Sequence, residues 1–279
     1  MWIIWLVADV LLSATIGSFQ FWILPAVWTV LALTLFSRRV QLHVLGPLLR
    51  ARRPNAIEFD AIATPWENVT TAAGANPQDF VLLIIDADEL NAYACGGHLV
   101  VTTSFAVREL PSDELAGVLA HELSHHLGLH TVSLTLIHWY SLPILLLARL
   151  GFALKNVAHA ATEAFVSHSS ALTALGRIFA GLLTGFSWAL LAVLYASDGV
   201  SNLVGHRSEF EADRRTVQLG FGRELAAALT HLISRGGGHR SIGWRQRLAA
   251  SHPPARTRIA RIDAILRHPA GVPKRPTAS

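Results

Sequence analysis

Two histidines four residues apart, with a glutamate beside the first, are the side chains in this sequence best suited to chemistry. His121, Glu122 and His125 lie in the run His-Glu-Leu-Ser-His. Positions four apart share one face of a helix, so the two imidazoles could bind one metal ion together. Glu122 could then reach a water bound to that metal, as in zinc peptidases. The pattern alone also fits a helix with incidental histidines, because the chain contains 14 of them.

A catalytic zinc site needs a third protein ligand and an open position for water. Glu209 and Asp213 offer a candidate, because they lie four residues apart in a segment that predicts a helix. Glu209 could bind the metal, while Asp213 could accept a hydrogen bond from the ring N–H of a zinc histidine and fix its tautomer. The alternative is a solvated helix face, since Arg214 and Arg215 follow directly.

Long apolar blocks set the context for these residues. Only 15% of the residues are charged and the mean hydropathy is +0.40, whereas about a quarter of a typical soluble domain is charged. The single cysteine, Cys95, excludes an intramolecular disulfide framework. The blocks cover about 1–36, 131–154 and 178–197, and a spanning helix needs about 20 apolar residues. They predict membrane helices; the alternative for the last two is a pair of buried helices in a soluble core.

The first block, 1–36, holds either one long helix or two short ones. A cleaved signal peptide is disfavoured because the block is too long and lacks both a basic start and a small-residue cleavage site. Several arginines follow at once, which by the positive-inside tendency places residues after 37 in the cytoplasm. A transmembrane hairpin over 131–197 returns to the same side. We therefore expect a multi-pass protein of the cytoplasmic membrane with its site facing the cytoplasm.

The C-terminal part of the chain is strongly basic. From Arg235 onward, ten Lys and Arg residues accompany a single acid, Asp263. Arg-rich helices on the cytoplasmic side suit anionic lipid headgroups, and the sequence contains no nucleic-acid recognition motif. The lipid bilayer is therefore an expected partner and nucleic acid is not.

Two polar regions flank the hairpin. Residues 37–130 predict strands at Phe80–Ile85 and Leu99–Thr103. A metal helix over 113–130 follows, with Ser112 as its N-cap.

The second polar region, 198–268, predicts a helical part of the same domain. One helix near 206–219 carries Glu209, and an amphipathic helix comes last. The Pro-rich tail, 269–279, predicts disorder.

Several motifs together resemble the HtpX-like membrane metallopeptidases, which are relatives of the CAAX prenyl endopeptidases. The similarity extends over about residues 80–266. Its motifs, in chain order, are Asn91-Ala92-Tyr93-Ala94-Cys95-Gly96-Gly97, Leu99-Val100-Val101-Thr102-Thr103, Asp113-Glu114-Leu115, His121-Glu122-Leu123-Ser124-His125-His126, Glu209-Phe210-Glu211-Ala212-Asp213, Ser251-His252-Pro253-Pro254 and Arg258-Ile259.

The resemblance implies a gluzincin-like zinc-peptidase domain, mostly α, with a small β-sheet next to the metal helix. A transmembrane helical hairpin interrupts this domain between the second and third ligands. It also implies an endopeptidase of protein quality control that cleaves membrane or misfolded proteins. Because His125 lies only six residues before Thr131, we expect cleavage near the membrane surface.

Residue by residue, His121, His125 and Glu209 match the family's ligands for one zinc ion per chain, and Glu122 matches its general base. Asp213 matches a catalytic acid sometimes described as a proton donor. We favour an orienting role, because a carboxylate four residues past the third ligand faces the metal histidines.

Other matches concern substrate. Asn91 and the strand after Gly97 match a segment next to the site, where a substrate would pair as an added strand. His252 matches a family histidine and is a candidate for substrate binding; its alternative is a turn residue before Pro253. The extra histidines His126 and His130 are expected to be structural, and Cys95 to be a packed residue.

Two other classes of function compete with an endopeptidase. A catalytically latent signalling or scaffold protein with a structural zinc site would be expected to lose Glu122 or a ligand, and none is missing. A transporter would carry polar residues inside its spans, whereas here they lie beside them. The substrate, the oligomeric state and the residue that stabilises the oxyanion stay open at this stage, and a zinc endopeptidase is the prediction.

Overall fold

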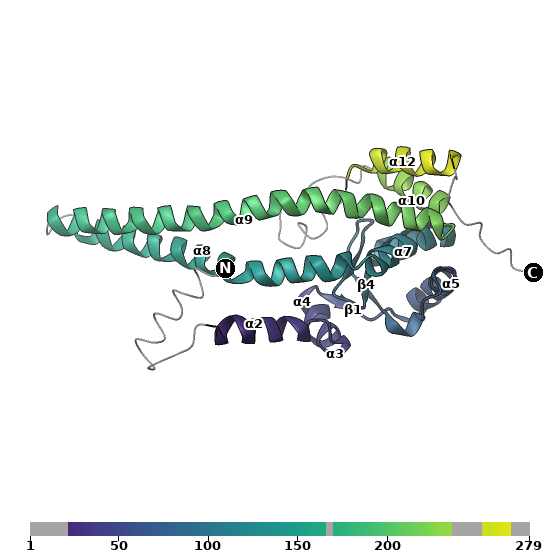
Figure 1. The fold of residues 1–279 in the computed structure, drawn as a ribbon, viewed down its shortest axis with the longest axis horizontal. Helices are drawn as coiled ribbons and strands as arrows, with labels where there is room; N and C mark the ends of the chain where they lie inside the picture. Colours follow the sequence, from purple (N-terminus) through teal and green to yellow (C-terminus); the bar gives the residue numbers. More distant parts are fainter. Residues whose placement is uncertain (1–21, 166–169, 236–252, 269–279) are drawn as a thin grey trace, which may run out of the picture. The chain divides into compact units, whose positions relative to one another are not determined.

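The computed structural model describes residues 22–165, 170–235 and 253–268 (Figure 1). By its internal contacts the chain divides into two compact units. Unit 1 consists of residues 1–31 and 136–201, and unit 2 of residues 32–135 and 202–279. The three candidate metal ligands all belong to unit 2, so one compact body contains them.

Unit 2 contains most of the helices and all four strands of the described residues. They are α3 (Arg38–Val40), the π-helix η1 (Gln41–Leu45), α4 (Gly46–Leu48), β1 (Ala51–Arg52), α5 (Ala56–Ala73), the 3-10 helix η2 (Pro77–Asp79), β2 (Val81–Ile85), β3 (Ala92–Cys95), β4 (Leu99–Thr103), α6 (Ser104–Glu109), α7 (Ser112–Leu127), α10 (Gly222–Ser234) and α12 (Ala255–Arg267). Three further helices extend from one unit into the other: α2 (Ile23–Thr34), α8 (His130–Phe165) and α9 (Ser170–Gln218).

Helices α8 and α9 carry the second and third apolar blocks. Their windows His130–Val157 and Thr173–Ala192 have a mean hydropathy of 1.5 and are long enough to span a bilayer. The helices run side by side (Figure 1) and approach closely at Gly151, where a Cβ would collide with Ser187 of α9. Large apolar side chains such as Leu182, 67% exposed, cover their outer faces. An exposed apolar surface of this extent indicates association with a membrane.

The first apolar block is described only from residue 22 onward. Helix α2 covers its C-terminal part, and with the bent segment after it forms a third candidate span if the pair counts as one. The choice between one long and two short helices rests on residues 1–21. These residues, like the tail 269–279 expected to be disordered, lie outside the described part of the chain.

A four-stranded sheet lies beside the metal helix. Its order is β1-β2-β4-β3, with β2 and β4 parallel and the outer pairs antiparallel. Strands β2 and β4 occupy the two predicted segments. Both are apolar runs covered on both faces: Ile84 and Val100 pack toward α5 and α7, whereas Leu83 and Val101 pack toward η1.

The helix that carries the two histidines, α7, differs from its predicted range at both ends. It begins at Ser112 with Pro111 in the N-cap position, and no side chain caps it. Acidic residues in the first turn instead interact favourably with the helix dipole. The helix ends at Leu127, three residues before the expected end at 130. The cause is Leu129, whose φ of 57° turns the chain into α8.

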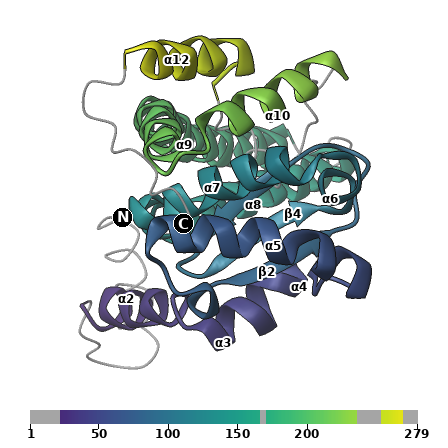
Figure 2. The same ribbon diagram turned by 90° about the vertical axis from the view of Figure 1, so that its right-hand side faces the viewer.

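Helix α7 is the centre of unit 2. Every residue from Leu115 to His126 is buried, because α5, α10 and the sheet pack around it (Figure 2). The side chains at positions 121, 122 and 125 are therefore enclosed by protein rather than displayed on a solvated face.

The helix predicted near 206–219 is the last part of α9, which continues from the candidate span to Gln218. No proline lies between Ser170 and Gln218 to interrupt it. Helix α12 is the amphipathic helix expected in this region. Its fully buried Ile262 packs with Val217 of α9 and with Leu225 and Leu229 of α10.

Gly117 sets the distance between α7 and α10, and replacing it by alanine should destabilise unit 2. An added Cβ would lie 2.6 Å from the carbonyl carbon of Glu224, a backbone atom that cannot rotate away. Overpacking of this kind typically costs about 1–3 kcal/mol, so we expect a lower unfolding midpoint in detergent. The matched control is Gly185→Ala in α9, where a Cβ meets nothing within 4 Å. A midpoint for Gly117→Ala at or above that of the control would contradict this packing.

Candidate metal centre

Three buried side chains from two distant segments of the chain meet in unit 2. His121 and His125 belong to α7, and Glu209 belongs to α9. The Nε2 atom of His125 lies 3.1 Å from Oε1 of Glu209, and Nε2 of His121 lies 3.4 Å from Oε2. One donor atom from each residue lies within 4.8 Å of the other two, and none of the residues is more than 7% exposed. The fold thus brings together the three side chains predicted as ligands.

Asp213 and an arginine form a second layer around these ligands. Oδ1 of Asp213 lies 3.1 Å from Nδ1 of His121. Arg258 of α12 donates to both carboxylate oxygens of Asp213, from Nη2 to Oδ1 at 2.7 Å and from Nε to Oδ2 at 3.0 Å. Its Nη1 lies 3.7 Å from Oε2 of Glu209. A bidentate pair of this kind fixes a carboxylate in orientation, so Asp213 is held where it can orient His121.

The pKa values of these groups follow from their contacts. Burial lowers the pKa of His121, as does the charge of Arg258, but hydrogen bonds to Asp213 and Glu209 outweigh both and raise it to about 9. Burial raises the pKa of Asp213, whereas His121 and Arg258 lower it, and the result is about 2. At neutral pH Asp213 is therefore a carboxylate that accepts a hydrogen bond from Nδ1–H of His121. Nε2 of His121 then faces both Oε2 of Glu209, at 3.4 Å, and Nη2 of Arg258, at 3.1 Å.

The centre has an excess of buried negative charge. Glu122, Glu209 and Asp213 are each at most 3% exposed, and Arg258 is the buried guanidinium that faces them. With His121 neutral, as a metal ligand must be, three carboxylates against one guanidinium leave two negative charges to be compensated, and an unpaired buried charge is costly. A divalent cation bound by two imidazoles and a carboxylate would supply that compensation. The donor set is the His₂Glu type that zinc prefers in peptidases.

Glu122 is the acid that has no fixed partner. Its Oε2 is buried and makes no hydrogen bond with any described residue. A buried carboxylate oxygen without a partner is expected only where a water, a metal or a substrate group completes it. The residues present therefore fit a metal site with an adjacent base.

Helix α9 contacts α7 close to the centre through hydrogen bonds. Oγ of Ser124 lies 3.4 Å from Oγ1 of Thr216, and Nη1 of Arg215 donates to the carbonyl oxygen of Ser124 at 3.3 Å. Ser124 and Thr216 are fully buried. These contacts position Glu209, although it comes from a helix distant in sequence.

The strand after Gly97 does not have the free edge that a paired substrate needs. It is β4, which is bonded to β2 on one side and to β3 on the other. The edge strand next to β4 is β3, and Asn91 immediately precedes it. The carbonyl of Asn91 accepts from the backbone N–H of Thr103 at 3.0 Å, so its backbone is fixed beside the sheet. The expectation is corrected from β4 to β3, because both neighbours of β4 are already in place.

A buried glutamine fixes the turn between β3 and β4. Gln41 of η1 donates from Nε2 to the carbonyl of Leu35 at 3.0 Å and accepts from the backbone N–H of His98 at 3.1 Å. Gly96 has a φ of 63°, and a Cβ there would meet the Gln41 amide carbon at 2.6 Å. The segment after α2 therefore holds the edge of the sheet.

Other predicted residues are placed as follows. His252 lies outside the described residues. His126 donates from Nε2 to the carbonyl of Leu99 at 2.9 Å, and burial lowers its pKa to about 4, as befits a structural role joining α7 to β4. The ring of His130 packs edge-on against that of His125, with centroids 5.7 Å apart. Burial raises the pKa of the Cys95 thiol to about 11, which suits a packed residue.

The role of Arg258 is the main feature that sequence reasoning missed. The sequence singles it out only as part of the motif Arg258-Ile259. A signal existed, because Arg258 lies four residues before the buried Ile262 and so shares the apolar face of an amphipathic helix. A charged residue on such a face needs a buried partner.

The chain is similar in sequence to known proteases. The model of a family described as peptidase family M48 matches residues 57–266. A protease HtpX homolog of Desulfotalea psychrophila is 27% identical over 233 residues, covering 76% of this chain and 75% of that protein. Protease HtpX of Shewanella frigidimarina is 32% identical over 197 residues, covering 64% of this chain and 65% of that protein.

Among solved structures, Ste24p of S. mikatae has a TM-score of 0.55 at 18% identity, with 94% of this chain and 66% of that chain covered. At this identity the likeness concerns the fold. The chain spans slightly less than two thirds of that protein and of the Shewanella frigidimarina protease. The resemblance drawn from the motifs is confirmed. So is the expected fold class, a mostly helical zinc-peptidase fold with a small sheet and an inserted pair of apolar helices.

Replacing Asp213 by asparagine should weaken metal binding without unfolding the protein. The amide keeps the shape of the side chain but loses the charge that holds both His121 and Arg258. Changes to groups that orient a metal ligand typically cost 10–100-fold in affinity, so we expect a loss of about that size. Zinc affinity is measured by competition with a fluorescent chelator. The control is Arg256→Gln, an exposed arginine on α12. Equal zinc affinity in Asp213→Asn and the control would show that Asp213 does not orient a ligand.

Proposed function

We propose, from the premise that this chain belongs to peptidase family M48, that it is a membrane-bound zinc endopeptidase. Membership supports a metalloprotease among the hydrolases. Its substrates are polypeptides, and we take membrane or misfolded proteins near the membrane surface as the class that it cleaves. The alternative raised by the sequence, a latent scaffold with a structural zinc, is not favoured by any feature of the centre.

The observation that carries the proposal is the combination of three ligands around one point with an unpartnered acid beside them. His121, His125 and Glu209 bring their donor atoms within 4.8 Å of one another. Glu122, the residue directly after the first ligand, has a buried oxygen with no partner among the described residues. A purely structural zinc site is closed by four protein ligands, and no fourth metal-binding side chain joins this cluster in the described part of the chain.

One zinc ion per chain would be held by His121, His125 and Glu209. It would supply Lewis-acid chemistry, polarising a carbonyl group and making a coordinated water more acidic. The two imidazoles and the carboxylate suit zinc, and the excess of two buried negative charges suits a divalent ion in general.

In this proposal Glu122 is the general base. It takes a proton from the attacking water and returns the proton to the leaving amine of the cleaved peptide bond. Its lack of a fixed partner is what this role requires, because a carboxylate already engaged in an ion pair would be a weaker acceptor.

Asp213 acts as a positioning residue. Its 3.1 Å contact with Nδ1 of His121 supports the orienting role over that of a proton donor, because both its oxygens are already engaged with His121 and Arg258. The site thus has one proton-transfer residue, Glu122, and one residue that holds a ligand in place.

Substrate and membrane orientation complete the proposal. An extended polypeptide would pair with the edge strand β3, for which main-chain hydrogen bonding provides affinity without sequence preference. Asn91 and His252 are candidates to contact it. The arginines that follow α2, such as Arg38 and Arg39, support a cytoplasmic location for this part of the chain by the positive-inside tendency. The protein would then be a multi-pass protein of the cytoplasmic membrane with a cytoplasmic site.

The test compares zinc content and casein cleavage in the detergent-purified wild type, Glu122→Gln and Glu209→Ala. Glu122→Gln should keep about one zinc per chain yet lose cleavage by at least about 100-fold, because the general base is missing. Glu209→Ala should lose most of its zinc and all detectable cleavage.

The matched control is Glu67→Ala, which removes an exposed acid on α5, away from the centre, and should leave both zinc content and cleavage unchanged. Cleavage by Glu122→Gln at the wild-type rate would contradict the protease assignment. Zinc retained in every variant without any cleavage would favour the structural site.

A further inference from the structure

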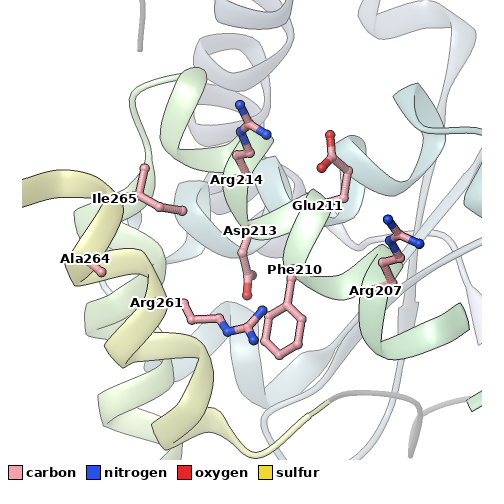
Figure 3. Close-up of a pocket in the computed structure, with 8 residues that line it drawn as sticks. All are labelled: Arg207, Phe210, Glu211, Asp213, Arg214, Arg261, Ala264 and Ile265. Carbon is pink, nitrogen blue, oxygen red and sulfur yellow. The ribbon is translucent and has the colours of Figure 1, made fainter. Parts of the chain in front are cut away.

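A pocket of about 400 Å³ adjoins the metal centre between α9 and α12 (Figure 3). Its size is in the range of sites that hold small molecules or short peptide segments. The lining residues are Arg207, Phe210, Glu211, Asp213 and Arg214 of α9 and Arg261, Ala264 and Ile265 of α12. Asp213 is common to this pocket and the metal centre, so an occupant would lie next to the ligands.

The positive charge of this pocket is not compensated. Asp213 is paired with Arg258, and Glu211 lies 3.8 Å from Arg215 on its own helix. None of the three arginines of the pocket, Arg207, Arg214 and Arg261, forms an ion pair with an acid among the described residues. Three free guanidinium groups around one concavity create a local positive potential that attracts anionic groups.

One of these arginines is held in place by an aromatic ring. The guanidinium carbon of Arg261 lies 3.6 Å from the ring centroid of Phe210 (Figure 3). A stacked guanidinium keeps its in-plane N–H groups available, and their fixed fork matches the two oxygens of a carboxylate. Arg261 is thus prepared to bind a carboxylate without first losing side-chain freedom.

The segment of the sequence that leads into α12 is poor in acidic residues. Between Glu224 and Asp263 the sequence contains no acidic residue, and it contains seven arginines. An acidic segment of a bound partner would match this uncompensated charge.

We infer that this pocket binds an acidic stretch of the polypeptide substrate, on one side of the bond that is cleaved. The inference rests on the proposed function, because it assigns the pocket to the same substrate. The pocket and the metal centre share the buried Asp213, so the two sites are neighbours, and a polypeptide bound across the metal centre would place one flank at the pocket. The carboxylates of the stretch bind Arg207, Arg214 and Arg261, while Phe210 and Ile265 contact its apolar groups.

The test measures binding of two fluorescein-labelled peptides by anisotropy to the full-length, zinc-loaded Glu122→Gln protein. The peptides have equal length and the same central segment, and one flank contains glutamates in one peptide and glutamines in the other. The glutamate peptide should bind about tenfold more tightly at low salt, as expected for several partly exposed ion pairs. Raising the ionic strength should reduce this preference.

The variant Arg207→Gln/Arg214→Gln/Arg261→Gln should bind both peptides with equal affinity. The matched control is Arg223→Gln/Arg256→Gln/Arg267→Gln, which removes the same charge from exposed positions on α10 and α12 outside the pocket. It should keep the preference for the glutamate peptide.

Equal affinity of the Glu122→Gln protein for the two peptides would overturn the inference, and so would an equal loss of preference in the two triple variants. Binding to phosphatidylglycerol vesicles that only the pocket variant loses, without any peptide preference, would overturn it in favour of a lipid site. Because binding rather than turnover is measured, a failure of the wild type to cleave casein contradicts the proposed function separately.

Discussion

The burial of three carboxylates against one guanidinium is the constraint on which the rest of unit 2 depends. Glu122, Glu209 and Asp213 lie beside Arg258 in a region closed to solvent. Such a group is stable only when its charge is balanced and its hydrogen bonds are made. The same excess of negative charge raises the pKa of His121, because a proton on that ring compensates part of it. A divalent cation bound at Nε2 of His121 would replace that proton and compensate the negative charge.

The elements around the centre are arranged to maintain this balance. Helix α7 is buried on all sides, so its histidines cannot move away from Glu209 without displacing α5 or α10. Helix α9 contributes the third ligand and also contains a candidate membrane span, so one continuous helix carries both the span and the ligand. Helix α12 supplies the compensating guanidinium from near the end of the described residues. The ligands therefore depend on parts of the sequence that lie far apart.

Local patterns predicted much of this arrangement, and long-range contacts account for what they missed. Helical spacing alone indicated that His121 and His125, and likewise Glu209 and Asp213, share a face. The strands at Val81–Ile85 and Leu99–Thr103 followed from their apolar runs. The parallel pairing of β4 with β2, which leaves β4 without a free edge, and the role of Arg258 depend on residues distant in sequence, which no local pattern encodes. The continuity of α9 was missed because the change from apolar to charged residues suggested a boundary, although no helix-breaking residue occurs there.

X-ray absorption at the zinc K-edge of the purified protein tests the central claim most directly, because it reports the atoms that surround the metal. The account predicts about one zinc per chain, coordinated by two imidazole nitrogens and by carboxylate or water oxygens at about 2.0–2.2 Å, with no sulfur. The Glu209→Ala protein should give only a residual zinc signal. A zinc bound by Cys95, or one whose imidazole signal persists after both His121 and His125 are replaced, would contradict the account.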